Sequence, residues 1–395
     1  MSGLRKRKSR QRPEQRRNEM IKKQIKHSGR KAARILLGAG LTALLAGCAG
    51  RTPKLPETEG TLNPQVSEEA NPSASQEEPL KEEPLKVVTT VFPYYDFTRQ
   101  ISGGLIESGQ VELELIVPAG MDSHSFEPTP ADIIKIQDAD LIICNGGAME
   151  QWFERVLDSL DTQNQQVITM MDYVDTVEEE IVEGMEAEEH DHSHDHVHPA
   201  GVPKEGEEGH LYDDGHEQEI EYDEHIWTSP VNAMTLSEVI AGTLCEMDES
   251  NQEIYRENLA EYEEKLSALD QKFRDIAEHG KRRLVVFGDK FPLRYFFDEY
   301  GLEYRAAFSG CSTDTEPSAK TIAYLIDKVR ELDIPAVYYL ELSSHRVAEI
   351  IGEETGAEPL LFHSCHNVTR REFDSGVTYL ELMEQNAVNL SKGLN

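Results

Sequence analysis

Short apolar runs alternate along this chain with longer stretches in which apolar residues recur at helical spacing. Four runs in the first half are predicted to be β-strands, at 86–92, 111–117, 140–145 and 166–170. The second half repeats the pattern at 283–287, 303–308, 336–340 and 359–362. Strands that alternate with helices are typical of parallel sheets. The pattern therefore predicts an α/β protein with two similar β-α lobes, each with a mostly parallel four-stranded sheet.

A long amphipathic helix is predicted between the two halves. Apolar side chains recur there at spacings close to an alternation of three and four residues, which places them on one helical face. About 28 residues at 1.5 Å per residue give a rod on the order of 40 Å, long enough to join two lobes rigidly. The alternative is a surface helix within one lobe. The residues of this face are Ile254, Leu259, Tyr262, Leu266, Leu269, Phe273 and Ile276.

The N-terminal region has the pattern of an export signal. The first 47 residues contain 14 Lys or Arg against two Glu, and they end in an apolar run too short to span a bilayer comfortably. The order Leu44-Leu45-Ala46-Gly47-Cys48 resembles the bacterial lipobox, in which the cysteine is acylated. We therefore predict a signal peptide at 1–47 and a lipid anchor on Cys48 at the extracytoplasmic face of the membrane. The alternative is a cytosolic protein with a basic arm that binds nucleic acid.

Acidic residues dominate the rest of the chain. The net charge is −35, and loss of the first 47 residues, which carry +12, would leave −47. So acidic a protein repels phosphates, which argues against a nucleic-acid partner, and it raises the local concentration of cations. The Pro-, Glu-, Ser- and Thr-rich segment 48–85 is predicted to be a disordered linker, because it cannot bury enough apolar surface to fold.

Seven histidines crowd among acids shortly before Asp223. Imidazole suits zinc, copper or nickel, and neighbouring carboxylates favour any dication, so this segment is predicted to gather metal. It has little apolar surface with which to pack, and we expect weak binding at several places. The alternatives are a purification tag, which the internal position and mixed composition argue against, or a solvated polar run. These histidines are His190, His192, His194, His196, His198, His210 and His216.

Four further cysteines follow Cys48. In an oxidising compartment they allow three complete pairings, which sequence alone cannot distinguish. Cys144 lies inside an apolar run and is expected to be a buried small residue. Cys311 and Cys365 share one half of the chain and are the favoured disulfide pair, with Cys245 left over.

Several motifs of the body together resemble the zinc and manganese substrate-binding lipoproteins of ABC importers. The resemblance runs from about Lys86 to the C-terminus and includes an acidic, histidine-rich insertion. It implies a first lobe at 86–249 with the insertion at 183–222, a connecting helix at 250–280, a second lobe at 281–395, and one metal ion in the cleft between the lobes. The motifs, in order, are 90–97 (TVFPYYDF), 118–130 (PAGMDSHSFEPTP), 139–141 (ADL), 145–147 (NGG) and 150–152 (EQW).

The resemblance also implies metal ligands. His124 and His225 stand in the family's first and second ligand positions, and His124 also follows a predicted strand end, where ligands gather in parallel-sheet lobes. The third position falls on Gly288, which has no donor, and the fourth, usually an aspartate, falls on His363. We therefore predict that His124, His225 and His363 form the core of the site.

Three histidines leave one place open at a four-coordinate zinc. Candidates for it are His366, Asp289, a water molecule, or the thiolate of Cys311 or Cys365. Glu316 matches a family motif near the cleft and is expected to support the site without binding the metal itself.

The predicted function is capture of Zn²⁺ and its delivery to an ABC-type membrane permease, by a monomeric protein that is not an enzyme. Neutral imidazoles favour zinc over manganese, which prefers carboxylate oxygen. The alternatives are a manganese-binding importer component, a zinc-storage or adhesin lipoprotein, and a zinc hydrolase. The hydrolase is disfavoured because His216-Glu217 lacks the second histidine of the H-E-x-x-H motif.

Overall fold

The computed structural model of this chain describes residues 83–160, 162, 164–185, 222–310 and 316–395. All elements discussed below belong to one compact unit, Glu82–Asn395. The predicted signal peptide, Cys48, the seven clustered histidines and Cys311 lie outside the described residues.

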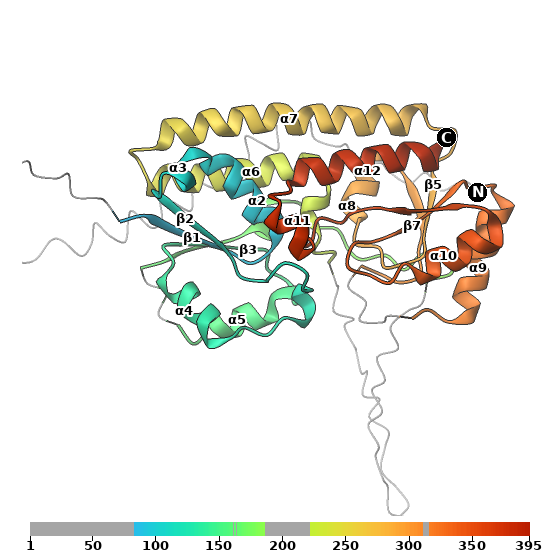
Figure 1. Ribbon diagram of the computed structural model, residues 1–395, viewed down its shortest axis with the longest axis horizontal. Coiled ribbons are helices and arrows are strands. Elements are labelled where there is room, and N and C mark those ends of the chain that lie inside the picture. The colour runs from blue at the N-terminus through green and yellow to red at the C-terminus, as the bar shows by residue number, and fades with distance from the viewer. Residues whose placement is uncertain (1–82, 161, 163, 186–221, 311–315) are drawn as a thin grey trace, which may run out of the picture. The chain divides into compact units, whose positions relative to one another are not determined.

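The first lobe is built on a parallel four-stranded sheet with the strand order β2-β1-β3-β4 (Figure 1). Each of the four predicted strands is present, although shorter than expected. Their bounds are β1 Leu85–Thr89, β2 Val111–Leu115, β3 Leu141–Cys144 and β4 Gln166–Thr169.

The second lobe repeats this topology with the order β6-β5-β7-β8. Its strands are β5 Leu284–Phe287, β6 Glu303–Arg305, β7 Ala336–Tyr339 and β8 Glu358–Leu361. The strand predicted at 303–308 ends at Arg305, because the N–H groups of Ala307 and Phe308 donate to the Asp289 carbonyl and leave the ladder. The prediction of two similar parallel-sheet lobes is confirmed.

Both faces of each sheet are covered, since successive strand residues point to opposite sides. In β1, Val87 joins the core beneath α2 and α6, whereas Val88 packs with residues of α4 and α5. In β5, Phe287 joins the first of these cores and Val286 packs with α9 and α10. The helices are α2 Phe92–Ser102, α3 Gly104–Glu107, α4 Pro130–Asp138, α5 Gln151–Leu157, α6 Pro230–Met247, α8 Arg294–Tyr300, α9 Ala319–Glu331, α10 Arg346–Thr355, α11 Arg370–Asp374 and α12 Tyr379–Leu394.

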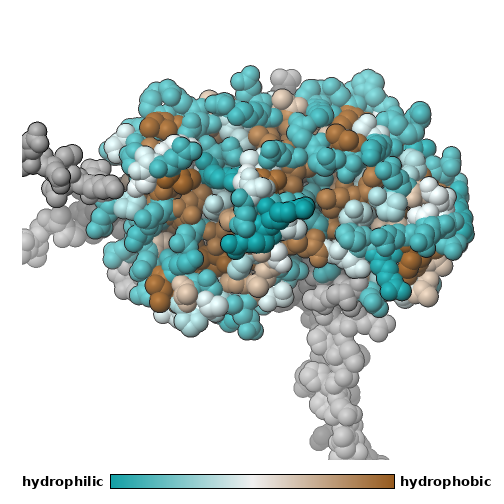
Figure 2. Space-filling model, in the orientation of Figure 1, coloured by the Kyte–Doolittle hydropathy of each residue, from teal (hydrophilic) through white to brown (hydrophobic). Residues whose placement is uncertain are grey.

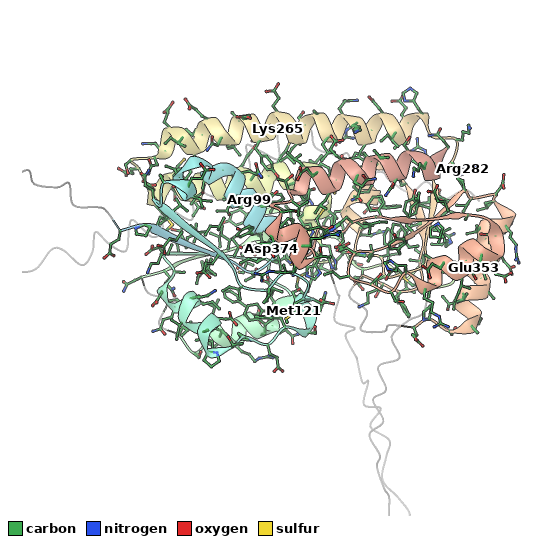
Figure 3. All side chains as sticks on the ribbon, viewed as in Figure 1. Arg99, Met121, Lys265, Arg282, Glu353 and Asp374 are labelled. Carbon is green, nitrogen blue, oxygen red and sulfur yellow. The ribbon has the colours of Figure 1, made fainter. Side chains whose placement is uncertain are left out.

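The predicted connecting helix is α7, Gln252–His279, with 28 residues. It packs against α2 and α6 of the first lobe and against α8 and α12 of the second (Figure 1). Its buried face includes Leu266 and Phe273, whereas Ile254 is exposed and Lys265 points to solvent (Figure 3). One apolar core runs continuously from Val87 through this face to Phe287, so α7 braces both lobes and is not a surface helix of one of them.

Two paired residues of α2, Asp96 and Arg99, also hydrogen-bond to the second lobe. The Asp96 carboxylate on α2 accepts hydrogen bonds from Arg99 at 2.6 Å and from the backbone N–H of Tyr379, the first residue of α12, at 2.7 Å. Arg99, labelled in Figure 3, also donates to the Val377 carbonyl at 2.6 Å. Burial raises the pKa of Asp96, although Arg99 partly offsets that rise. These contacts fix the start of α12 against the first lobe.

The face shown in Figure 2 is largely hydrophilic, with hydrophobic residues dispersed between the polar ones. Among the described helices, none combines the length and the hydrophobicity that a membrane crossing requires.

Candidate metal site

A cleft of about 680 Å³ contains side chains from both lobes. Its walls come from the loops that follow β2 in the first lobe and β5, β6, β7 and β8 in the second, from α9 and α10, and from His225. Ligands of open parallel sheets gather at such carboxyl ends of strands. Three histidines meet here: His124, His225 and His366.

His124 lies on a short 3-10 turn, Ser123–Ser125, after β2. Asp122 caps this turn, because its carboxylate accepts the backbone N–H of His124 at 3.0 Å. The cap holds the His124 side chain at the cleft, beside the rings of His225 and His366.

His225 is buried just before the 3-10 turn Ile226–Thr228. The Asp223 carboxylate accepts the backbone N–H of His225 at 2.8 Å and lies 3.2 Å from its Nδ1. Such a carboxylate fixes the ring orientation and leaves Nε2 available to a metal. The next carboxylate, Glu224, accepts the N–H groups of Ala148 and Met149, which anchors this loop on the turn before α5.

His366 reaches the cleft from the segment after β8, and its Nε2 lies 2.6 Å from the Ser123 hydroxyl oxygen. The ring centroid of His366 is 5.9 Å from that of His124 and 5.8 Å from that of His225, and the latter two are 6.1 Å apart. Three imidazoles on a tetrahedral zinc, with Zn–N of roughly 2.0–2.1 Å, would have centroids about 5 Å apart. No three His, Cys, Asp or Glu side chains among the described residues are close enough to hold a metal as they stand. The three rings therefore form a slightly expanded site that must contract by on the order of 1 Å.

The three imidazoles differ in their protonation. Desolvation in the cleft, followed by the nearby His225, lowers the pKa of His124 to about 4. Burial, followed by His225 and His124, lowers the pKa of His366 to about 3. Burial also lowers the pKa of His225, but the hydrogen bond and charge of Asp223 outweigh it, and the net pKa is raised. At neutral pH, His124 and His366 are therefore neutral and can donate a lone pair to a metal.

His363, the predicted third ligand, does not join this cluster, because its ring faces other groups. The side chain is buried, its Nδ1 accepts the backbone N–H of Cys365 at 2.9 Å, and Nδ1 lies 3.5 Å from the Glu341 carboxylate. Its backbone N–H and carbonyl both bond the Asn386 side chain, at 2.7 Å each. His363 thus fixes the end of β8 against α12. The histidine three residues later reaches the cleft in its place.

Gly288 has no side chain with which to bind a metal, and the Asp289 carboxylate accepts hydrogen bonds from other groups. A Cβ at Gly288 would come within 2.8 Å of the Ala348 backbone nitrogen in α10, so the close approach of that helix requires glycine. The Asp289 carboxylate accepts the N–H groups of Lys290 at 2.8 Å and Leu340 at 3.0 Å, and also the Ser343 hydroxyl. Its hydrogen bonds hold the second-lobe loops together, which argues against its candidacy as a ligand.

Within the part of the chain that the structure describes, Cys144, Cys245 and Cys365 are not members of the histidine cluster. Cys144 is buried in β3 as expected, and burial raises the pKa of its thiol. Cys365 is a buried free thiol, so the predicted disulfide with Cys311 is not made in this structure. Burial also raises the pKa of Cys365, which disfavours it as a thiolate ligand. Glu316 lines the cleft, and its supporting role stays a prediction.

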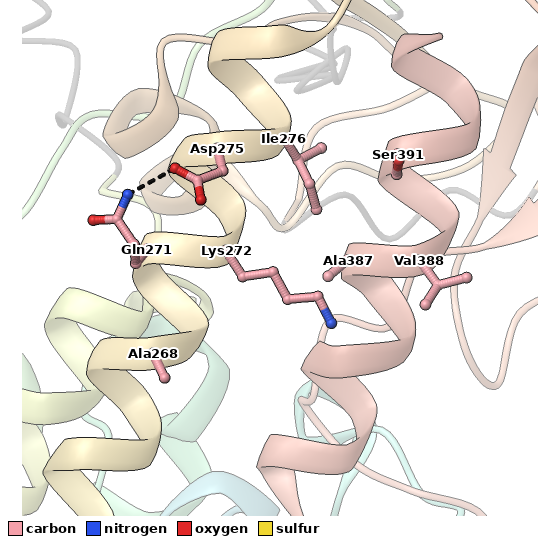
Figure 4. Close-up of a pocket in the computed structure, with 8 residues that line it drawn as sticks. All are labelled: Ala268, Gln271, Lys272, Asp275, Ile276, Ala387, Val388 and Ser391. Atoms are coloured by element: carbon pink, nitrogen blue, oxygen red, sulfur yellow. Dashed lines mark hydrogen bonds between the residues drawn. The ribbon is translucent and has the colours of Figure 1, made fainter.

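A second groove, of about 540 Å³, lies between α7 and α12 (Figure 4). Its lining contains no histidine or cysteine, and Lys272 spans it to pair with Glu384 of α12. The groove therefore lacks the donors of a metal site.

Comparison with known proteins agrees with this geometry. The model of the ZnuA family, described as the periplasmic component A of a zinc-uptake complex, matches residues 87–393. The chain is 32% identical over 302 residues to the zinc-binding lipoprotein AdcA of Streptococcus pneumoniae, which covers 76% of this chain and 54% of that protein. It is 31% identical over 314 residues to the high-affinity zinc uptake system protein ZnuA of Bacillus subtilis, which covers 80% of this chain and 89% of that one.

A solved structure, the Zn(II)-bound ZnuA-like domain of Streptococcus pneumoniae AdcA, matches with a TM-score of 0.60 and 27% identity. The match covers 79% of this chain and 99% of that domain. The chain thus spans about half the length of AdcA, the half that contains the ZnuA-like domain. On its fold and on the extent of these matches, the chain belongs to the ZnuA family of zinc-uptake components.

Proposed function

We propose that this protein captures Zn²⁺ outside the cytoplasm and delivers it to an ABC-type permease. The observation that carries the proposal is the meeting of His124, His225 and His366, from two different lobes, at one cleft. Its family membership and its zinc-binding relatives support the same function. The ion is the cargo of the protein, which holds and releases it without chemical change.

The chemistry of the donors favours zinc. Neutral imidazoles suit zinc, copper or nickel, whereas manganese prefers carboxylate oxygens. We assign the fourth place at the metal to the Asp122 carboxylate, with water as the alternative. Burial raises the pKa of Asp122, but His366 and the N–H of His124 lower it by more, so Asp122 is ionised at neutral pH and available to a cation.

Substitution of the two competing histidines tests the assignment. His366→Ala should weaken zinc binding at least about tenfold, or roughly 1.4 kcal/mol, in competition titrations against a fluorescent chelator. The matched control is His363→Asn, whose side-chain oxygen can replace Nδ1 as acceptor for the Cys365 N–H. This control should bind zinc like the wild type. The assignment is wrong if the control loses the metal and His366→Ala keeps it.

The predicted lipid anchor fits a captor that works beside a membrane permease. We propose that Cys48 is acylated and that the unit Glu82–Asn395 acts as a monomer at the extracytoplasmic face. Stable anchoring needs two or more acyl chains, at about 0.8 kcal/mol per buried CH₂. Cys48→Ser should therefore move the protein from the membrane fraction to the soluble fraction of cell extracts. Equal membrane retention of the two forms would mean another anchor.

A further inference from the structure

The loop that carries His124 is held by a side chain of the second lobe. Asn367 is buried, and its amide nitrogen donates to the carbonyls of Pro118 at 2.9 Å and Met121 at 2.7 Å. Its amide oxygen accepts the N–H of Val368 at 2.8 Å. Asn367 directly follows the ligand candidate His366. One short segment therefore contains the His366 imidazole and also holds the loop that contains His124.

A second residue of the second lobe holds the loop that carries His225. The hydroxyl of Tyr295, on α8, donates to the Asp223 carbonyl at 2.7 Å and accepts the N–H of Val177 at 3.3 Å. The N–H of Asp223 in turn donates to the Val177 carbonyl at 2.9 Å. Asp223 is the residue whose carboxylate orients His225. The hydroxyl of Tyr295 therefore fixes the backbone of Asp223, whose carboxylate orients the His225 ring.

Ion pairs and further hydrogen bonds strengthen this second attachment. Glu180 pairs with Arg294, the Glu180 carbonyl accepts the hydroxyl of Tyr304 at 3.4 Å, and Glu183 lies 3.7 Å from Arg305. All three partners belong to α8 or β6 of the second lobe. The described residues between β4 and His225 are thus bound to the second lobe, through Val177, Glu180 and Glu183.

From these contacts we infer that Asn367 and Tyr295 are positioning residues that set the affinity of the cleft for metal without touching it. The inference rests on the proposed zinc-binding function. The three rings must close by on the order of 1 Å around an ion, and a site that is 1 Å too loose binds poorly. The polar atoms of Asn367 and the hydroxyl of Tyr295 bond to backbone, so their contribution is to place the loops of His124 and His225.

Paired variants test this inference. Asn367→Ala and Tyr295→Phe each remove the hydrogen bonds of one second-lobe side chain to a ligand loop. Each should weaken Zn²⁺ binding about 10- to 100-fold, as loss of supporting hydrogen bonds around a metal does. The controls are Asn389→Ala, which removes a buried amide bond of 2.7 Å to the Leu361 carbonyl, and Tyr338→Phe, which removes a buried hydroxyl bond of 2.9 Å to the Asn389 carbonyl. The controls lose the same kind of bond at a distance from both loops and should bind Zn²⁺ like the wild type.

The visible spectrum of the Co²⁺-loaded proteins supplies a readout that a loss of stability alone does not change. The two test variants should show altered intensity and position of the cobalt bands, whereas folded control variants should match the wild type. Test variants that bind Zn²⁺ as tightly as their controls, with unchanged Co²⁺ spectra, would overturn the inference. Failure of the wild type itself to bind Zn²⁺ would instead overturn the proposed function.

Discussion

At the scale of single residues, the three imidazoles are chemically alike but not equally ready to bind metal. His124 and His366 have pKa values lowered to about 4 and about 3, so protons compete with metal for them only in acid. The pKa of His225 is raised above its ordinary value of 6.5 by Asp223. Proton competition near neutral pH is therefore concentrated on one ligand.

This difference predicts the pH dependence of zinc affinity. A protonated imidazole cannot ligate, so affinity should fall as pH drops below the raised pKa of His225, by about tenfold per pH unit, which corresponds to one proton. The slope should steepen only as the pH approaches 4, where His124 begins to take up a proton. Zinc titrations in non-chelating buffers between pH 7.5 and pH 5 measure this slope.

Asp223→Asn supplies the control for that experiment. Without the carboxylate, burial dominates the pKa of His225, and the onset of proton competition should move to lower pH. A wild-type slope of two or three protons near neutral pH, or an onset that the substitution does not move, contradicts the assignment.

The sequence motifs predicted that His124 and His225 would lie together with His363, whereas the structure places His366 beside the first two. His124 and His225 lie within long, ordered motifs, which fix their place at strand and helix ends. His363 and His366 lie three residues apart in one loop, and the conformation of the backbone between them determines which side chain faces the cleft. Cys365 has a φ of 60°, in the left-handed region that non-glycine residues seldom adopt. The residue types of this segment do not predict the turn. After the turn, the His366 side chain lies at the cleft.

The roles of Asn367 and Tyr295 could not be predicted from the sequence either. The Met121 and Asp223 carbonyls, to which they donate hydrogen bonds, are 246 and 72 residues away along the chain.

At the scale of elements, periodicity was sufficient for most of the fold. Apolar runs identified the eight strands of the described residues, and the spacing of apolar residues identified the 28-residue α7. Strand ends were less predictable. At β6, the N–H groups of Ala307 and Phe308 donate to the Asp289 carbonyl and do not form hydrogen bonds of the sheet. The core shared by both lobes depends on contacts between distant segments, which periodicity does not reveal.

The contact between α2 and α12 gives a stability prediction. Asp96→Ala leaves Arg99 and the Tyr379 N–H without their buried acceptor, and it should reduce the free energy of unfolding by about 3 kcal/mol. Asp374→Ala, which breaks the exposed pair with Arg370, is the control and should change it by less than about 0.5 kcal/mol. Urea unfolding followed by circular dichroism measures both. Equal effects of the two substitutions would mean that Asp96 does not link the lobes.

At the scale of the whole molecule, the histidine-rich insertion is attached by a structured stem. Glu178 and Tyr222 form an antiparallel bridge, and Gly184 lies against the ring of Tyr324 of the second lobe. The predicted loop boundaries of 183–222 therefore include a few residues that belong to the folded body. We therefore expect the position of His225 to depend on this stem.

Removal of 188–215 should separate the two kinds of site. The deletion keeps the stem and His225, so calorimetry should still detect one tight zinc site of unchanged affinity, while the weaker binding events disappear. Circular dichroism checks that the fold is intact. Loss of the tight site from a folded deletion variant would place the principal site in the insertion.

The most direct test of this account is a crystal structure of the zinc-loaded protein, with the metal located by anomalous scattering at the zinc edge. We predict one zinc ion in the interlobe cleft, with a ring nitrogen of each of His124, His225 and His366 about 2.0–2.1 Å from it. The Nδ1 of His363 should still accept the backbone N–H of Cys365. A zinc ion bound by His363 while His366 stays well beyond that distance, or a cleft left empty while zinc occupies the insertion, would contradict it.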